Sequence, residues 1–103
     1  MATGILGQAT PVAATLTTVY TVPAAKVATF NVSIVNTSAV QVLVRLAIAS
    51  TNTPTASEYI EYDTLLGVNE IIERTGIVAN AAEKVIIYAS IAGVSVSVYG
   101  YEE

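Results

Sequence analysis

The chain has 103 residues, a length that suits one domain with a single hydrophobic core. Apolar residues make up 53% of it and charged residues only 12%, which is about half the 25% charged share of an ordinary soluble domain. Cysteine and histidine are both absent, which excludes disulfides, thiolate metal sites and histidine-based catalysis. The net charge of −4, with only four basic residues, argues against nucleic acid and anionic membranes as partners.

The mean hydropathy of +0.63 is high enough to raise the question of a membrane protein. The longest apolar run, "AVQVLVRLAIA", is shorter than the roughly 18–20 residues that a spanning helix needs, and Gln41 and Arg45 interrupt it. The first basic residue is Lys26, so the basic start of a signal peptide is missing. We therefore expect a protein that is made and used inside a cell, or released from it by lysis.

The first residues, 1–15, carry no charge and contain Gly4, Gly7 and Pro11. Such a segment frays unless other parts of a protein hold it in place. We expect an extended N-terminal leader that lies against its own sheet or against a neighbouring subunit. Residues 16–103 are expected to form one β-sandwich domain.

From residue 16 onward, apolar and polar residues alternate with period two. Val94, Val96 and Val98, for example, alternate with serines, and such alternation is typical of β-strands. About seven strands are predicted, at roughly 16–22, 26–36, 40–49, 57–64, 69–75, 83–91 and 94–101. The pattern predicts an all-β fold, an antiparallel β-sandwich of immunoglobulin-like or jelly-roll-like type, with a small barrel as the alternative.

Turn residues separate these strands. "LGVN" at 66–69 is expected to reverse the chain, and "AG" at 92–93 is expected to form a two-residue hairpin. Gly93 would supply the positive φ that such a hairpin requires.

Many positions predicted to face outward are apolar, on several strands. They are Val27, Val35, Leu43, Ala47, Ala49, Ile71 and Ile86. A surface with so many apolar side chains favours self-association or incorporation into an assembly, although a closed barrel covered by its loops would also explain it. The candidate assembly interface comprises Ile5, Leu6, Val12, Leu43, Ile71, Ile86, Tyr99 and Tyr101.

The stretch "EYIEYDTLLGVNEIIER" holds Glu58, Glu61, Asp63, Glu70 and Glu73. Strand alternation places Glu61 and Asp63 on one face, where they resemble a glycosidase pair or a hard-metal site. No calcium-loop pattern supports a metal, and a chain of this size has little room for a deep cleft. We therefore expect the carboxylates to mark a solvated face, with Arg74 pairing with Glu61 and Arg45 with a nearby carboxylate. No catalytic residue, metal ligand or cofactor is predicted.

Tyrosine supplies most of the aromatic surface, because the chain has six tyrosines, one phenylalanine and no tryptophan. Tyr99 and Tyr101 share a face of the last predicted strand. They could anchor a protein interface, stack on a sugar ring, or flank the core with their hydroxyls in water.

Two stretches resemble a known group of proteins. "VYTVPAAKVATFNVSIVNTSAVQVLVRLAIA" and "EYIEYDTLLGVNEIIERTGIVANAAEKVIIYAS", the latter followed by "VSVSVYGYEE", are similar to small structural proteins of tailed bacteriophages, notably those of cyanobacteria. The positions that carry the resemblance are Tyr20, Pro23, Asn36, Arg45, Glu61, Tyr62, Glu73, Arg74, Gly76 and Gly100. Ala25 departs from the pattern, which often has glycine there.

The resemblance implies a non-enzymatic virion component, made in the host cytoplasm and released by lysis. The expected role is a capsid decoration protein that contacts copies of itself and the major capsid protein. The alternative is a tail, baseplate or fibre-associated protein, including a host-recognition or carbohydrate-binding module that uses Tyr99 and Tyr101. Neither nucleic acid nor a membrane is an expected partner.

Overall fold

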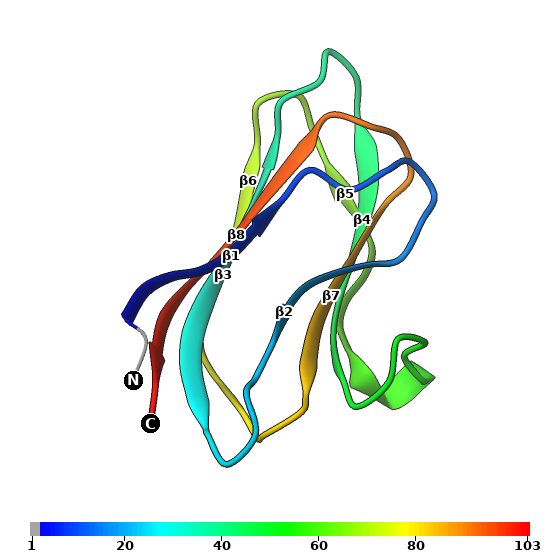
Figure 1. The fold of residues 1–103 in the computed structure, drawn as a ribbon. Helices are drawn as coiled ribbons and strands as arrows, with labels where there is room; N and C mark the ends of the chain where they lie inside the picture. The colour runs from blue at the N-terminus through cyan, green and yellow to red at the C-terminus, as the bar shows by residue number, and fades with distance from the viewer. Residues whose placement is uncertain (1–2) are drawn as a thin grey trace.

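Eight β-strands form two four-stranded antiparallel sheets that face each other in a β-sandwich (Figure 1). The computed structural model describes residues 3–103. Its strands are β1 (Thr3–Ala9), β2 (Thr17–Thr21), β3 (Ala28–Asn36), β4 (Val42–Ala49), β5 (Tyr59–Leu66), β6 (Ile71–Ala79), β7 (Lys84–Ala89) and β8 (Val94–Glu102). The predicted antiparallel sandwich is confirmed, with eight strands instead of seven.

One sheet, here called sheet A, has the strand order β1-β8-β3-β6, and the other, sheet B, has the order β2-β7-β4-β5. Only the β4–β5 connection joins neighbouring strands of one sheet, and every other connection crosses between the sheets. The predicted hairpin at 92–93 is therefore wrong, because β7 and β8 lie in different sheets. Gly93 does adopt the expected positive φ, at 102°.

The alternation of apolar and polar residues in the sequence correctly predicts which side chains of β3 form the core. On β3 every second side chain is buried, including Phe30 and Ile34, and on β4 Leu46 faces them from the other sheet. β-branched residues dominate this core because they pack well on a pleated surface.

The expected leader contributes an edge strand. Residues 3–9 form β1, which pairs antiparallel with β8, so that Thr3 lies opposite Tyr101 and Ala9 opposite Val96. A register shift between Ile5 and Gly7 interrupts the pairing, and Leu6 at this bulge packs against the core. Residues 1–2 of the leader lie outside the described residues.

A short 3-10 turn, η1 (Ala56–Glu58), lies in the β4–β5 loop. The Glu58 carboxylate accepts a hydrogen bond from the Thr55 backbone N–H at 2.8 Å, and this bond holds the pKa of Glu58 below its usual value. Within residues 3–103, no helix is long and apolar enough to cross a membrane.

Candidate functional site

A second, smaller apolar cluster lies on the outer face of sheet B. Ala47, Ala49 and Ile86 are buried there, and the ring of Tyr59 packs against them. These three residues do face away from the main core, as the alternation predicts. Their predicted exposure is wrong, however, because Tyr59 covers them, and Ile86 is only 1% exposed. Ile86 is therefore not part of an interface with another protein.

Beside this cluster, Arg45 lies between two tyrosines. Its guanidinium carbon is 4.3 Å from the centroid of the Tyr62 ring and 4.5 Å from that of Tyr88. Asp63 holds the guanidinium from the side, with bonds of 2.6 Å to Nε and 3.2 Å to Nη2. This fork lowers the pKa of Asp63 and raises that of Arg45. The four side chains form an ordered array on the surface of the sheet, here called the Arg45 array.

A bulged stretch of β5 creates this arrangement. Val44 pairs with Thr64 and Leu46 with Glu61, so two residues of β5, Tyr62 and Asp63, lie opposite the single residue Arg45. Asp63 has a positive φ of 50°, which an aspartate tolerates better than most residues. The prediction that Glu61 and Asp63 share a face is wrong, because this extra residue breaks the alternation between them.

Glu61 turns inward, away from Asp63. It is 6% exposed, forms an ion pair with Arg74 on β6, and accepts a hydrogen bond from the Thr64 hydroxyl at 2.7 Å. Because β5 and β6 are edge strands of opposite sheets, this ion pair joins the sheets along one side of the sandwich. Both expected arginine–carboxylate pairs are therefore present, and each carboxylate has its own arginine.

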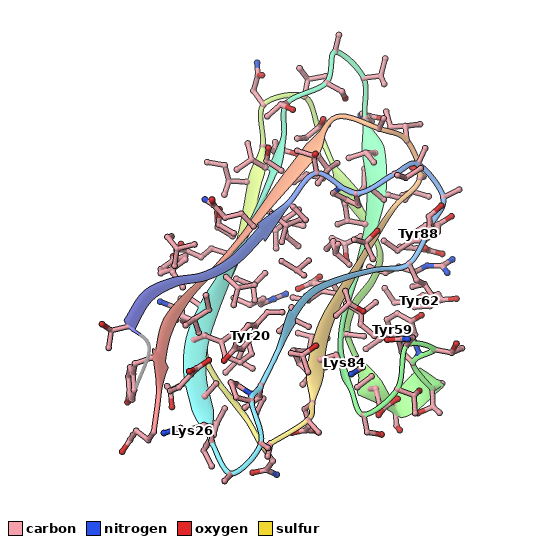
Figure 2. All side chains as sticks on the ribbon, viewed as in Figure 1. Tyr20, Lys26, Tyr59, Tyr62, Lys84 and Tyr88 are labelled. Atoms are coloured by element: carbon pink, nitrogen blue, oxygen red, sulfur yellow. The ribbon has the colours of Figure 1, made fainter. Side chains whose placement is uncertain are left out.

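A shallow hollow opens next to the Arg45 array, between the β4–β5 loop and the start of β5. Its volume is about 560 Å³, and its lining consists of Pro54, Ala56, Tyr59 and Tyr62. Figure 2 shows Tyr59, Tyr62 and Tyr88 on the same side of the sandwich, next to this loop. Sequence reasoning missed the hollow, because strict alternation places Tyr59 and Tyr62 on opposite faces of the strand.

The outer face of sheet A carries the other predicted tyrosines. Ile5 of β1 lies directly opposite Tyr99 of β8, and Tyr101 follows on the same face. Tyr99 donates a hydrogen bond to the Glu73 carboxylate, which raises the pKa of Tyr99. Ile5 is 59% exposed and Tyr101 41%. These three predicted interface residues are therefore brought together on one surface.

The end of the sandwich formed by the β3–β4 and β5–β6 connections has a polar centre. The buried Asn36 side-chain amide donates to the carbonyl oxygens of Val40, Leu66 and Gly67, at 2.8, 3.1 and 3.0 Å. Its side-chain oxygen accepts from the backbone N–H of Ser38 at 3.0 Å. One asparagine thus fixes both connections. Figure 1 shows these two connections at the same end of the sandwich.

Exposed aliphatic side chains surround this end of the sandwich, where Asn36 binds the two connections. The tip patch, as we call it, consists of Val40, Leu43, Leu65, Val68 and Ile71, and their exposed fractions range from 39% to 63%. Leu43 and Leu65 lie opposite each other on β4 and β5. Leu43 therefore lies on the outer face of sheet B, whereas Ile71 pairs with Val35 on sheet A, so the tip patch is a rim around one end of the sandwich. It also contains three residues that were not predicted.

The eight predicted interface residues do not form a single surface. Ile5, Tyr99 and Tyr101 lie on sheet A, Leu43 and Ile71 in the tip patch, and Val12 in the exposed connection between β1 and β2. Leu6 and Ile86 pack inside the fold.

Among residues 3–103, no group of three or more acidic side chains is placed to hold a metal ion. No protein-family model, curated protein or solved structure matches the chain.

Proposed function

We propose that the chain is a non-enzymatic structural protein of a tailed-bacteriophage virion, and that it decorates the assembled head. The observation that carries this proposal is the tip patch, where five aliphatic side chains are exposed on the two connections that Asn36 holds in place and on the strand ends beside them. A rigid apolar surface favours docking because little side-chain and loop entropy is lost on binding. The resemblance of 19–49 and 58–103 to phage structural proteins supplies the virion context.

The size of the tip patch favours docking onto an assembled shell over a dimer held by two tips. Full burial of an aliphatic side chain contributes roughly 1.5–3 kcal/mol, so the ten half-exposed side chains of two facing tip patches contribute on the order of 10 kcal/mol. That gain lies inside the roughly 4–15 kcal/mol that association costs, so it leaves little surplus for a stable dimer. A shell supplies further contacts, such as those to Ile5 and Tyr101 on sheet A.

The test uses particles of the phage that carries the gene, produced with that gene deleted. Purified protein is added back, and its binding to the particles is measured by co-sedimentation and located by electron cryomicroscopy. We expect density on the head for the wild-type chain. Density confined to the tail would replace the head assignment with a tail assignment, and the absence of binding would overturn the proposal.

A double variant, Val40→Ser with Val68→Ser, removes apolar surface from the tip patch only. The matched control is Val78→Ser, because Val78 is also exposed, at 63% against 55% for Val40 and 45% for Val68, but lies near the end of β6 away from the tip patch. We expect the double variant to bind at least tenfold more weakly and the control to bind as the wild type does. Equal binding by both variants would exclude the tip patch as the docking surface.

A further inference from the structure

The hollow beside the Arg45 array has the form of a small-molecule site. Its volume of about 560 Å³ lies within the roughly 300–1,000 Å³ usual for ligand pockets, and two of its four lining residues are tyrosines. We propose that this hollow binds a saccharide, with one pyranose ring stacked on Tyr62. This inference goes beyond the proposed virion role and does not depend on it.

Tyr62 is held in place before any ligand arrives. Arg45 covers one side of its ring, and Asp63 and Tyr88 in turn fix Arg45. The Tyr62 residue nevertheless remains 58% exposed, compared with 41% for Tyr101. An exposed aromatic ring that is already immobilised loses little entropy when a ligand stacks on it.

Tyr59 forms a second wall of the hollow, and its ring stands at right angles to the Tyr62 ring. The two ring centroids are 4.9 Å apart and the ring planes meet at 82°. Tyr59 is itself fixed, because it packs on the buried Ala47 and Ile86. Two perpendicular rings present one flat surface and one edge with a hydroxyl. A pyranose ring has matching chemistry, since its C–H face stacks on an aromatic ring and its rim carries hydroxyls.

The loop beside the hollow lines it with Pro54 and Ala56 and carries polar side chains of the matching kind around them. Residues 50–57, "STNTPTAS", contain five hydroxyl side chains and one amide, and most of them are exposed. Two nearby carboxylates are already engaged, because Glu58 accepts from Thr55 and Asp63 pairs with Arg45. Hydroxyl and amide groups without a free carboxylate favour a hydroxyl-rich ligand over a cationic one.

The position of the hollow leaves the docking surface free. It lies at the start of β5, whereas Leu65 of the tip patch lies at the end of the same strand (Figure 1). A subunit docked through its tip patch would therefore present the hollow away from the particle. The sequence pointed instead to Tyr99 and Tyr101 as a sugar platform, but Tyr99 is bonded to Glu73 there.

The test is an NMR titration of the full chain with four disaccharides, namely maltose, cellobiose, mannobiose and N,N'-diacetylchitobiose, and with a polyproline peptide as the competing ligand class. We expect at least one disaccharide to shift the Tyr59 and Tyr62 ring signals together with the amides of residues 50–58. Failure of all four to shift these signals, or shifts produced by the peptide alone, would overturn the proposal.

Two variants test the site independently, so the test does not depend on a single substitution that could disturb the fold. Tyr62→Ala removes the stacking ring, and Ala56→Arg fills the hollow while leaving the Arg45 array untouched. The matched control is Tyr101→Ala, which removes an exposed tyrosine from sheet A. We expect both site variants to weaken disaccharide binding at least tenfold and the control to leave it unchanged. An equal loss in the control, or undiminished binding by Ala56→Arg, would contradict the assignment.

Discussion

Tyr20 on β2 donates its phenolic hydrogen to the carboxylate of Glu102 on β8, and this hydrogen bond links sheet B to sheet A through the interior. Both side chains are buried, and the Tyr20 ring also packs edge-on against Phe30, with the centroids 6.1 Å apart. Figure 2 shows Tyr20 between the two sheets. The pair satisfies two polar groups inside an otherwise apolar core.

We expect Tyr20→Phe to lower the free energy of unfolding by about 1–3 kcal/mol, because it leaves the buried Glu102 carboxylate without its partner. Urea unfolding followed by circular dichroism measures the loss. The control is Tyr99→Phe, which removes a hydroxyl bonded to the exposed Glu73 and should cost less than about 0.5 kcal/mol. Equal losses in the two variants would show that burial of the bond is unimportant.

The same pair predicts a loss of stability at alkaline pH. Burial, together with the bond to Glu102, raises the pKa of Tyr20 well above its ordinary value of about 10. Because the folded pKa exceeds the unfolded one, this contribution to stability is fully present below about pH 10 and is lost as the pH rises further. We expect unfolding free energies measured from pH 8 to 11 to fall less steeply for Tyr20→Phe than for the wild type. Parallel profiles would contradict the assignment.

At acid pH the Asp63 carboxylate of the Arg45 array should take up a proton and lose its charge. The pKa of Asp63 is lowered by Arg45, so its contribution is present above the ordinary aspartate pKa of about 3.9 and is lost as the pH falls through the lower folded value. We expect Asp63→Asn to be less stable than the wild type at pH 7, and the difference to narrow as the pH falls below about 3.9. Asparagine also tolerates the positive φ of this position, so the backbone is not the cause of any loss.

The control for this acid profile is Glu103→Gln, which alters an exposed carboxylate outside the array. Its stability should follow the wild type at both pH values. A stability difference between Asp63→Asn and the wild type that does not narrow between pH 7 and pH 2 would indicate a role other than pairing with Arg45.

We expect Asn36→Asp to loosen the tip patch. Aspartate has nearly the same shape but cannot donate to the carbonyl oxygens of Val40, Leu66 and Gly67, so the free energy of unfolding should fall by about 2–4 kcal/mol. Hydrogen exchange should accelerate at 37–41 and 67–70. Asn52→Asp is the control, since its exposed side-chain oxygen accepts a bond from the Thr18 hydroxyl at 3.4 Å and still can after the change. Unchanged exchange at both connections would contradict this role of Asn36.

The sheet architecture could be predicted from the sequence where alternation is regular. β3 and β8 alternate regularly, and their buried apolar residues, such as Phe30 and Val96, are the predicted ones. β4 alternates only from Val42 to Leu46, because Ala47 and Ala49 on its outer face are buried as well. β1 was not predicted as a strand, because "TGILGQA" contains two glycines and does not alternate. Its partner β8 is almost 90 residues away in the chain, and no local pattern reveals such a pairing.

The candidate site could be predicted only in part, for two physical reasons. The bulge in β5 changes the direction of every side chain near Asp63, and alternation contains no signal for an extra residue. The burial of Ile86 depends on the Tyr59 ring that packs over it. The ion pairs were easier to foresee, because few charges are available and both Arg45 and Arg74 have carboxylates on a strand that is consecutive to their own along the chain.

The place of β8 in sheet A has a consequence for folding during synthesis. β8 lies between β1 and β3 and hydrogen-bonds to both, yet it follows all seven other strands in the chain. On a ribosome, β1 and β3 therefore wait without their shared partner, and sheet A cannot be completed until β8 has left the exit tunnel. Such pairing between distant segments slows folding and leaves strand edges open meanwhile.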